Sequence, residues 1–450
     1  MNNSDVKEHP IGTTENLATE QQTIDRNYPN VLWVGRMSFT GGYASITKNY
    51  LRAFSRVGIR YASIDSLSLK FIGAANAYFW QWNEEQKVFS TPGDLLVVVN
   101  EVPTDFDKVR IKGRGRLVGC TLFETHSIPV DWLNYLDLVD EIWVPTKFNL
   151  ETFSRAGVPK DKLRVVPYCL DTDFYDNRIQ PLNIPNVKSF IFLYVLSNLN
   201  RKDVGLLLRS YFKAFQDNRD ITLLIKIISK SSNVLKQIRE SAKPEFDFDD
   251  PRLPQVLVIQ DNLSCERMRR LYKACDVYVT TERAKGWDYP AMEAMAMGKP
   301  VVSIDWGGST EFLRKDNSFL IPHRGRLTPV DPELVSNLPL YSGQMWPDVW
   351  EEDVVETLIQ AYKKKDLRVA YGLKGRKEVN NNYSLEAVGR KLADVLQLYD
   401  NNGYSGTGSA RVKILPFKHL EKPKLVSRQP LATLVHNVKR GLNRLKRNIR

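Results

Sequence analysis

The sequence is poor in the residues that build covalent or metal-bound frameworks. Its 450 residues include only four cysteines and five histidines. The cysteines are scattered, with no pair at CxxC spacing, and the histidines show no ligand spacing. We therefore expect neither a disulfide framework nor a metal site, and the cysteine usage is typical of a reducing compartment. No cofactor is expected either.

Long apolar runs are also missing. No stretch reaches the roughly 18 apolar residues of a transmembrane helix. The first 28 residues are polar, unlike a signal peptide, and their composition predicts a disordered leader. We therefore expect a cytoplasmic protein.

Positive charge is confined to one end of the chain. The net charge is +12, and the last forty residues hold twelve Lys or Arg against one acid, Glu421. Residues 431–450 place apolar side chains on one helical face and cations on the other. This pattern is typical of a helix lying on an anionic membrane surface; the alternative is a helix packed on protein with its basic face solvated. Nucleic acid is not expected, because no aromatic residue follows Phe417.

Strand-like apolar runs alternate with helical segments in two series. The first extends from VLWVG at 31–35 to LRVVP at 163–167, and the second from SFIFLYVL at 189–196 to SFLIP at 318–322. Such alternation predicts an α/β protein with two Rossmann-like domains, each a parallel sheet covered by helices. The predicted organisation is a disordered leader (1–28), a first domain (29–180), a second domain (181–383), a closing helix (384–400), and a flexible linker with a basic amphipathic helix (401–450).

Ligands of such sheets bind beyond the carboxyl ends of the strands. Gly41 and Gly42 follow the first strand; they suit either a phosphate-binding turn or a plain strand-to-helix turn. Arg201 and Lys202 follow the first strand of the second series. There Lys supplies a point charge and Arg a fork for a diphosphate.

The stretch 280–313 carries a second group of candidates. Pro290 favours a helix start, and Glu293 follows about one turn into that helix. A carboxylate there can accept two hydrogen bonds from a ribose diol, while the helix N-terminus holds a phosphate. The alternative for Glu293 is an exposed helix acid. The methionines at 295 and 297 are expected in the core.

These residues resemble the retaining glycosyltransferases of family 4, the group 1 transferases. The resemblance rests on Gly286-Trp287, Pro290, Glu293-Ala294-Met295-Ala296 and Gly298-Lys299-Pro300-Val301. Residues 123–133, 140–159 and 164–174 are also similar, so that it spans roughly residues 31–400. It implies a GT-B fold, with two domains facing each other across a cleft. It further implies retaining transfer from a nucleotide-diphosphate sugar, as co-substrate, without a metal ion.

The resemblance also implies roles for individual residues. Glu293 would bind the donor ribose, Arg201 and Lys202 the diphosphate, and Gly41 and Gly42 the donor phosphates from the first domain. His126 would contribute to the sugar pocket, or would be a structural histidine. The remaining predicted donor-binding residues are Gly286, Trp287, Asp288 and Pro290.

One position departs from the family. The first Glu of its pattern, eight residues before Glu293, is Lys285 here, and Asp288 replaces a glycine. A lysine ammonium accepts no hydrogen bond and opposes a developing oxocarbenium ion. Either Glu282 takes over that place, or Lys285 suits an unusual donor or pairs with a phosphate, or transfer is lost. His126, Lys285 and Glu282 are therefore the candidate catalytic residues.

The function predicted is hexosyl transfer to a glycan or lipid-linked acceptor. It would serve cell-surface polysaccharide or glycolipid synthesis, with the protein peripheral on the cytoplasmic face of the membrane. One alternative is a catalytically silent nucleotide-sugar-binding or scaffold protein of the same fold. Another is a nucleotide-sugar epimerase, for which the sequence offers a weaker set of acids and bases.

Overall fold

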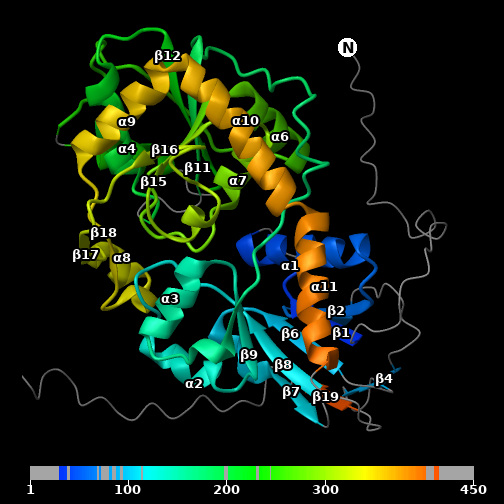
Figure 1. Cartoon of the computed structure of the whole chain (residues 1–450). Helices are drawn as coiled ribbons and strands as arrows, with labels where there is room; N and C mark the ends of the chain where they lie inside the picture. The colour runs from blue at the N-terminus through cyan, green and yellow to red at the C-terminus, as the bar shows by residue number, and fades with distance from the viewer. Residues whose placement is uncertain are drawn as a thin grey trace, which may run out of the picture.

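The computed structural model describes residues 30–37, 41–67, 70–71, 81–83, 88–91, 95–112, 115–196, 201–229, 233–243, 245–401 and 410–414. The predicted leader and the predicted basic helix lie outside these residues. Among the described helices, none combines the length and the apolar character needed to span a membrane. The described chain forms two α/β domains, one above the other in Figure 1.

The first domain is built on a seven-stranded sheet of order β10-β9-β8-β6-β1-β2-β3. Its strands are parallel except for the edge strand β3. The bounds are β1 (Asn30–Gly35), β2 (Tyr61–Asp65), β3 (Lys70–Phe71), β6 (Leu95–Asn100), β8 (Gly115–Cys120), β9 (Glu141–Val144) and β10 (Leu163–Val165). The helices are α1 (Gly42–Arg56), α2 (Leu133–Leu136) and α3 (Lys147–Arg155).

The second domain has a six-stranded, wholly parallel sheet of order β13-β12-β11-β14-β15-β16. The strands are β11 (Phe190–Leu196), β12 (Ile221–Ile227), β13 (Gln255–Ile259), β14 (Val277–Thr280), β15 (Val301–Ile304) and β16 (Phe319–Ile321). Strand order reverses between β11 and β14, which is where ligands of open α/β sheets bind. The helices are α4 (Val204–Phe215), α5 (Val234–Ser241), α6 (Cys265–Ala274), α7 (Tyr289–Ala296), α9 (Glu351–Lys363) and α10 (Lys365–Asn382).

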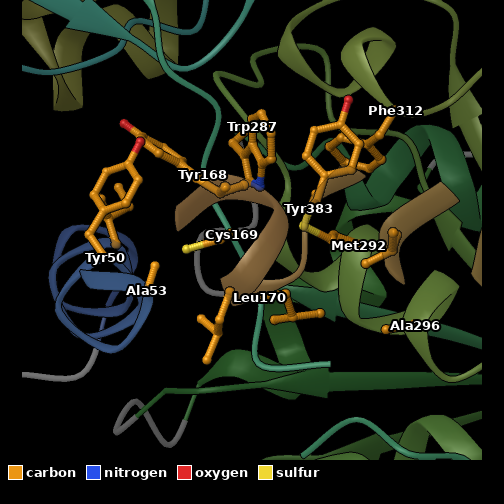
Figure 2. Close-up of a cluster of buried hydrophobic side chains, with 14 of the residues drawn as sticks. Tyr50, Ala53, Tyr168, Cys169, Leu170, Trp287, Met292, Ala296, Phe312 and Tyr383 are labelled. Atoms are coloured by element: carbon orange, nitrogen blue, oxygen red, sulfur yellow. The ribbon is translucent and has the colours of Figure 1, made fainter. Parts of the chain in front are cut away.

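A shared hydrophobic cluster joins the two domains (Figure 2). Trp287 of the second domain lies at its centre, with ring centroids 5.3 Å from Tyr168, 5.2 Å from Phe312 and 5.6 Å from Tyr383. Tyr168 belongs to the segment that connects the domains, and it packs in turn on Tyr50 of α1. The buried face of α1 therefore belongs to a cluster that includes residues of both domains.

The last helix, α11 (Leu385–Asn401), leaves the second domain and packs across α1 of the first (Figure 1). Gly389 makes this approach possible. A Cβ atom on it would lie 2.7 Å from Cγ1 of Val57 and 2.9 Å from the carbonyl oxygen of Ala53. The close packing of two helices thus depends on the absence of a side chain at this position.

Beyond α11 the chain returns to the first domain. Strand β19 (Ala410–Ile414) inserts between β5 (Val88–Thr91) and β7 (Val109–Lys112), with β4 (Gln81–Asn83) at the edge. The prediction of a flexible linker and tail over 401–450 is therefore wrong for residues 410–414. The sequence before this strand is polar and rich in glycine, and the partner strands lie about 300 residues earlier in the chain. The local sequence therefore gave no sign of a strand.

The segment between β16 and α9 is a second departure from prediction. It holds β17 (Leu327–Pro329), α8 (Pro332–Asn337) and β18 (Met345–Pro347). Leu334, Tyr341 and Trp346 belong to the same buried cluster as Phe123 and Trp132 of the first domain. Although this segment falls inside the predicted second domain (181–383), its side chains complete the core of the first. The periodicity of a single sequence does not show that a segment of one domain packs into the core of the other.

We expect Gly389→Leu to lower stability by about 1–3 kcal/mol, because the new side chain forces α11 away from α1. Thermal melting followed by circular dichroism measures the change. Gly42→Leu is the matched control, since a Cβ at Gly42 meets no described atom within 4 Å. Equal melting temperatures for the two variants would contradict the packing described here.

Candidate active site

Arg201 and Lys202 lie beyond the carboxyl end of β11, just before α4. Lys202 is 6% exposed. Its carbonyl oxygen accepts a hydrogen bond from the hydroxyl of Tyr194 and another, 3.4 Å long, from that of Thr281. Asp203 adopts a left-handed conformation (φ 47°) and caps α4 by accepting from the amide of Leu206 at 3.2 Å. This turn fixes the direction of both cations.

Glu282 binds both cations. It follows β14, the strand beside β11, so that its carboxylate and the cations meet at one edge of the sheet. One carboxylate oxygen lies 2.5 Å from a guanidinium nitrogen of Arg201, and the other contacts the ammonium of Lys202. Only 2% of Glu282 is exposed. A buried carboxylate thus holds two neighbouring cations.

Arg201 also reaches across to the first domain. Its guanidinium lies 2.9 Å from a carboxylate oxygen of Glu124 and donates to the carbonyl of Ala284 at the same distance. The other oxygen of Glu124 accepts a hydrogen bond from Tyr341. Burial opposes the charge on Arg201, yet Glu124 and Glu282 raise its pKa above the ordinary value. Arg201 therefore stays protonated, and its side chain bridges the two domains.

Lys285 lies nearby but bonds elsewhere. It is 2% exposed, and its ammonium donates to the hydroxyl of Ser303 at 2.6 Å, at the end of β15. Burial lowers the pKa of Lys285, against the attraction of Asp288 and Glu282. Its charge is therefore easier to remove than that of an exposed lysine, which reduces the objection to a cation at this position.

The loop after Lys285 is fixed by backbone packing. A Cβ on Gly286 would lie 2.2 Å from Cδ1 of Leu122 in the first domain. Trp287 is in the shared core rather than in an open site. Asp288 is left-handed (φ 90°) and caps α7 by accepting from the amide of Ala291 at 3.2 Å. Burial raises the pKa of Asp288, and its second oxygen has no hydrogen-bond partner among the described residues.

Pro290 occupies the first turn of α7, as predicted, and Glu293 lies one turn further on. The hydroxyl of Tyr272 on α6 donates to Glu293 at 2.6 Å, and Tyr175 in the connecting segment also bonds it. Burial raises the pKa of Glu293, while these two hydroxyls lower it by a smaller amount. Two phenols therefore orient a partly buried carboxylate, which keeps unused acceptor capacity.

His126 lies on another side of this region. Its Nδ1 accepts from the amide of Met345 at 2.9 Å, and burial with the nearby Arg155 lowers its pKa. The lowered pKa favours the neutral imidazole, and a ring that accepts at Nδ1 carries its proton on Nε2. It borders a cavity of about 500 Å³ between the domains, which is also lined by Phe148 and Trp306. The structure gives His126 no bond to Glu282 or Lys202 among the described contacts.

Gly41 and Gly42 are exposed at the start of α1. The next residue, Tyr43, bonds Thr121 at 3.2 Å, and this contact turns the helix start towards the strand end that carries Glu124. Both interpretations of the glycine pair, phosphate-binding turn and plain turn, fit this position. Residues 38–40 of the loop lie outside the described residues.

Sequence reasoning missed Glu124 and Tyr341 as members of the site. Glu124 lies two residues before His126, within residues 123–133 that resemble the family, but nothing local shows that its partner lies 77 residues away. Tyr341 lies in the segment that enters the first domain, which no periodicity predicted. In the described part of the chain, no group of three or more His, Cys, Asp or Glu side chains is placed to hold a metal ion.

Comparisons with known proteins agree on the fold and on a general class. Residues 188–329, about a third of the chain, match the family model described as glycosyl transferases group 1. A curated relative, uncharacterized protein 356 of Sulfolobus islandicus rod-shaped virus 1, is 21% identical over 63% of this chain and 77% of its own length.

Solved structures share this fold. A glycosyltransferase from Rickettsia africae aligns with a TM-score of 0.58 and 14% identity, over 84% of this chain and 100% of its own. Anabaena HepE, in complex with UDP and glucose, aligns at 0.54 and 12%, over 82% and 100%. The chain spans only 55% of the length of the S. aureus TarM structure, with a TM-score of 0.48. The predicted GT-B fold is confirmed, and the matched region is similar to the group 1 glycosyltransferases.

Proposed function

We propose that this protein transfers a sugar from a nucleotide-diphosphate sugar to a glycan or lipid-linked acceptor. The observation that carries the proposal is the cation pair Arg201 and Lys202 at the carboxyl end of β11. It lies at the strand-order reversal, within the residues that match the group 1 model. Adjacent cations at such a position suit a diphosphate.

Helix α7 supplies the residue proposed to bind the ribose of the donor. Glu293 has acceptor capacity for the ribose hydroxyls, and it is held in place by Tyr272 and Tyr175. Anabaena HepE was solved with UDP and glucose, so UDP-sugars are the first donors to test. A hexosyl donor and retention of the anomeric configuration complete the proposal, on the strength of the family resemblance.

The chemistry is electrostatic in this proposal. The bond between the anomeric carbon and the diphosphate oxygen breaks, and Arg201 with Lys202 stabilises the charge that develops on the leaving diphosphate. The acceptor hydroxyl forms the new bond to the anomeric carbon, and its proton passes to the leaving diphosphate. Contact of the two domains around the site excludes water, which suppresses hydrolysis of the donor.

The expected setting is the cytoplasmic face of a membrane, in cell-surface polysaccharide or glycolipid synthesis. Residues 431–450, outside the described residues, would supply the contact with anionic lipid. Strand β19 supports this placement, because it anchors the chain before that segment to the first domain.

The second candidate is a nucleotide-sugar-binding protein without transferase activity. Lys285 favours it, since the resemblance expects a carboxylate at this position and the ammonium is tied to Ser303 instead. A donor screen separates the two candidates. Purified protein is mixed with UDP-, GDP-, ADP- and TDP-sugars and with lipid acceptors, and both binding and release of nucleoside diphosphate are measured. Release establishes transfer or hydrolysis; binding without release establishes the second candidate; no binding rejects both.

Glu293→Gln is expected to weaken donor binding about 10- to 100-fold, because an amide accepts fewer hydrogen bonds from a ribose and carries no charge. Isothermal titration with the donor from the screen measures it. Glu356→Gln, at an exposed position of α9, makes the same chemical change outside the site and should bind like wild type. Equal affinities for the two variants would remove Glu293 from the donor site.

Donor binding should weaken as pH falls. The loss should begin at a higher pH than it would if the carboxyl had an ordinary pKa. Burial raises the pKa of Glu293 above 4.5, so the carboxylate that accepts the ribose hydroxyls is protonated earlier on acidification. A nucleotide sugar keeps its diphosphate charge over this range. Affinity measured from pH 8 down to pH 5 should fall in wild type and stay level in Glu293→Gln. Parallel curves would assign the pH effect to another group.

Lys285→Met should leave donor affinity within about threefold of wild type, since the ammonium is bonded to Ser303 and not to the carboxylates that hold Arg201. Titration calorimetry measures affinity, and thermal melting checks the fold. Lys236→Met on the surface of α5 is the control. A tenfold loss of affinity at an unchanged melting temperature would show that Lys285 contacts the donor.

A further inference from the structure

The cations proposed to hold the donor are already occupied in the free protein. Glu282 contacts Arg201 at 2.5 Å and Lys202 through its other oxygen, and it does so while almost fully buried. Its two oxygens therefore take the positions that two diphosphate oxygens require. We propose that Glu282 is a built-in competitor of the donor diphosphate, which must displace this carboxylate to reach Arg201 and Lys202. The inference rests on the proposed function and adds a regulation of the same site.

The charge balance of the site supports displacement. Arg201, Lys202 and Lys285 are the cations of the site, and Glu124, Glu282, Asp288 and Asp305 are the carboxylates that act on them. The carboxylates already balance these cations, so adding the two negative charges of a diphosphate is unfavourable unless a carboxylate leaves. Glu282 is the carboxylate that contacts both of the cations in question, so it is the one that the diphosphate replaces.

The contacts that remain explain why the site survives displacement. Arg201 keeps the carboxylate of Glu124 and the carbonyl of Ala284, each at 2.9 Å. Lys202 stays within electrostatic range of Asp288. The backbone of Lys202 is held by Tyr194 and Thr281 independently of its charge. Removing Glu282 from the pair therefore frees two positioned cations.

A purely structural ion pair predicts the opposite response to mutation. If Glu282 only held the loop together, its removal would disorder the cations and weaken anion binding. If Glu282 were the carboxylate that touches the transferred sugar, its removal would slow turnover and leave diphosphate affinity unchanged. A gain in affinity separates a competing carboxylate from both of these roles.

The test measures binding of UDP, GDP, ADP and inorganic pyrophosphate to full-length wild type and Glu282→Gln by titration calorimetry. We expect the variant to bind pyrophosphate and one nucleoside diphosphate at least tenfold more tightly. Glu240→Gln, which removes one carboxylate from an exposed ion pair on α5, is the matched control and should match wild type. Glu282→Asp keeps the charge but is one methylene too short to reach both cations, and should show a smaller gain; it replaces the Gln variant should that fail to fold.

The outcomes separate the two proposals. If a nucleoside diphosphate binds wild type and the Glu282 variants equally or more weakly, the competing role of Glu282 is wrong and the donor site stands. If no nucleoside diphosphate binds any of the proteins, the proposed function is wrong. In that case the pyrophosphate titrations alone decide the inference. If the Glu282 variants bind pyrophosphate no more tightly than wild type, the inference is overturned.

Discussion

Two loops of the second domain meet backbone to backbone beside the candidate site, and a side chain of the first domain packs directly on one of them. A Cβ on Gly308 would lie 1.9 Å from the carbonyl oxygen of Gly286, and a Cβ on Gly286 would lie 2.2 Å from the side chain of Leu122. The amide of Gly308 also donates to the carbonyl of Lys285 at 2.7 Å. The first domain, the loop after β14 and the loop after β15 are thereby locked together. Because these contacts include residues 285 and 286, they also restrict the positions of their neighbours Ala284 and Trp287.

The residues on either side of this contact make other contacts between the domains. Trp287, next to Gly286, is directed into the cluster that joins the connecting segment, α1 and Tyr383 (Figure 2). On the other side, Ala284 presents its carbonyl to Arg201, which continues to Glu124 in the first domain. A single turn of chain thus has an apolar anchor on one flank and a charged bridge on the other. Segments 384–401 and 327–347 add further contacts to the first domain, so that it is held at three places.

Much of the fold was predictable because it depends on short-range patterns. Buried strands such as Phe190–Leu196 are continuous apolar runs, and the helix over 147–155 ends where Gly157 adopts a positive φ (107°). The residues missed are those whose partners are far away in the chain. β19 needs β5 and β7, and Tyr341 needs Glu124, and neither pairing leaves a local signal. The cations Arg201 and Lys202 were found because a strand end is a local feature. Of their carboxylate partners, Glu282 was a candidate only as a replacement for the glutamate expected at 285, and Glu124 was missed.

The sequence and the structure suggest different roles for Lys285. In sequence, it is a cation at the position of an expected carboxylate, and it suggests lost chemistry. In the structure, the ammonium is bonded to Ser303, burial lowers its pKa, and the carboxylate that contacts the cation pair is Glu282, three residues earlier. The local charge has been rearranged rather than reversed, because each cation of the group has a carboxylate within its surroundings. The family pattern identifies the loop, and the physical arrangement of charge within it determines what the loop can bind.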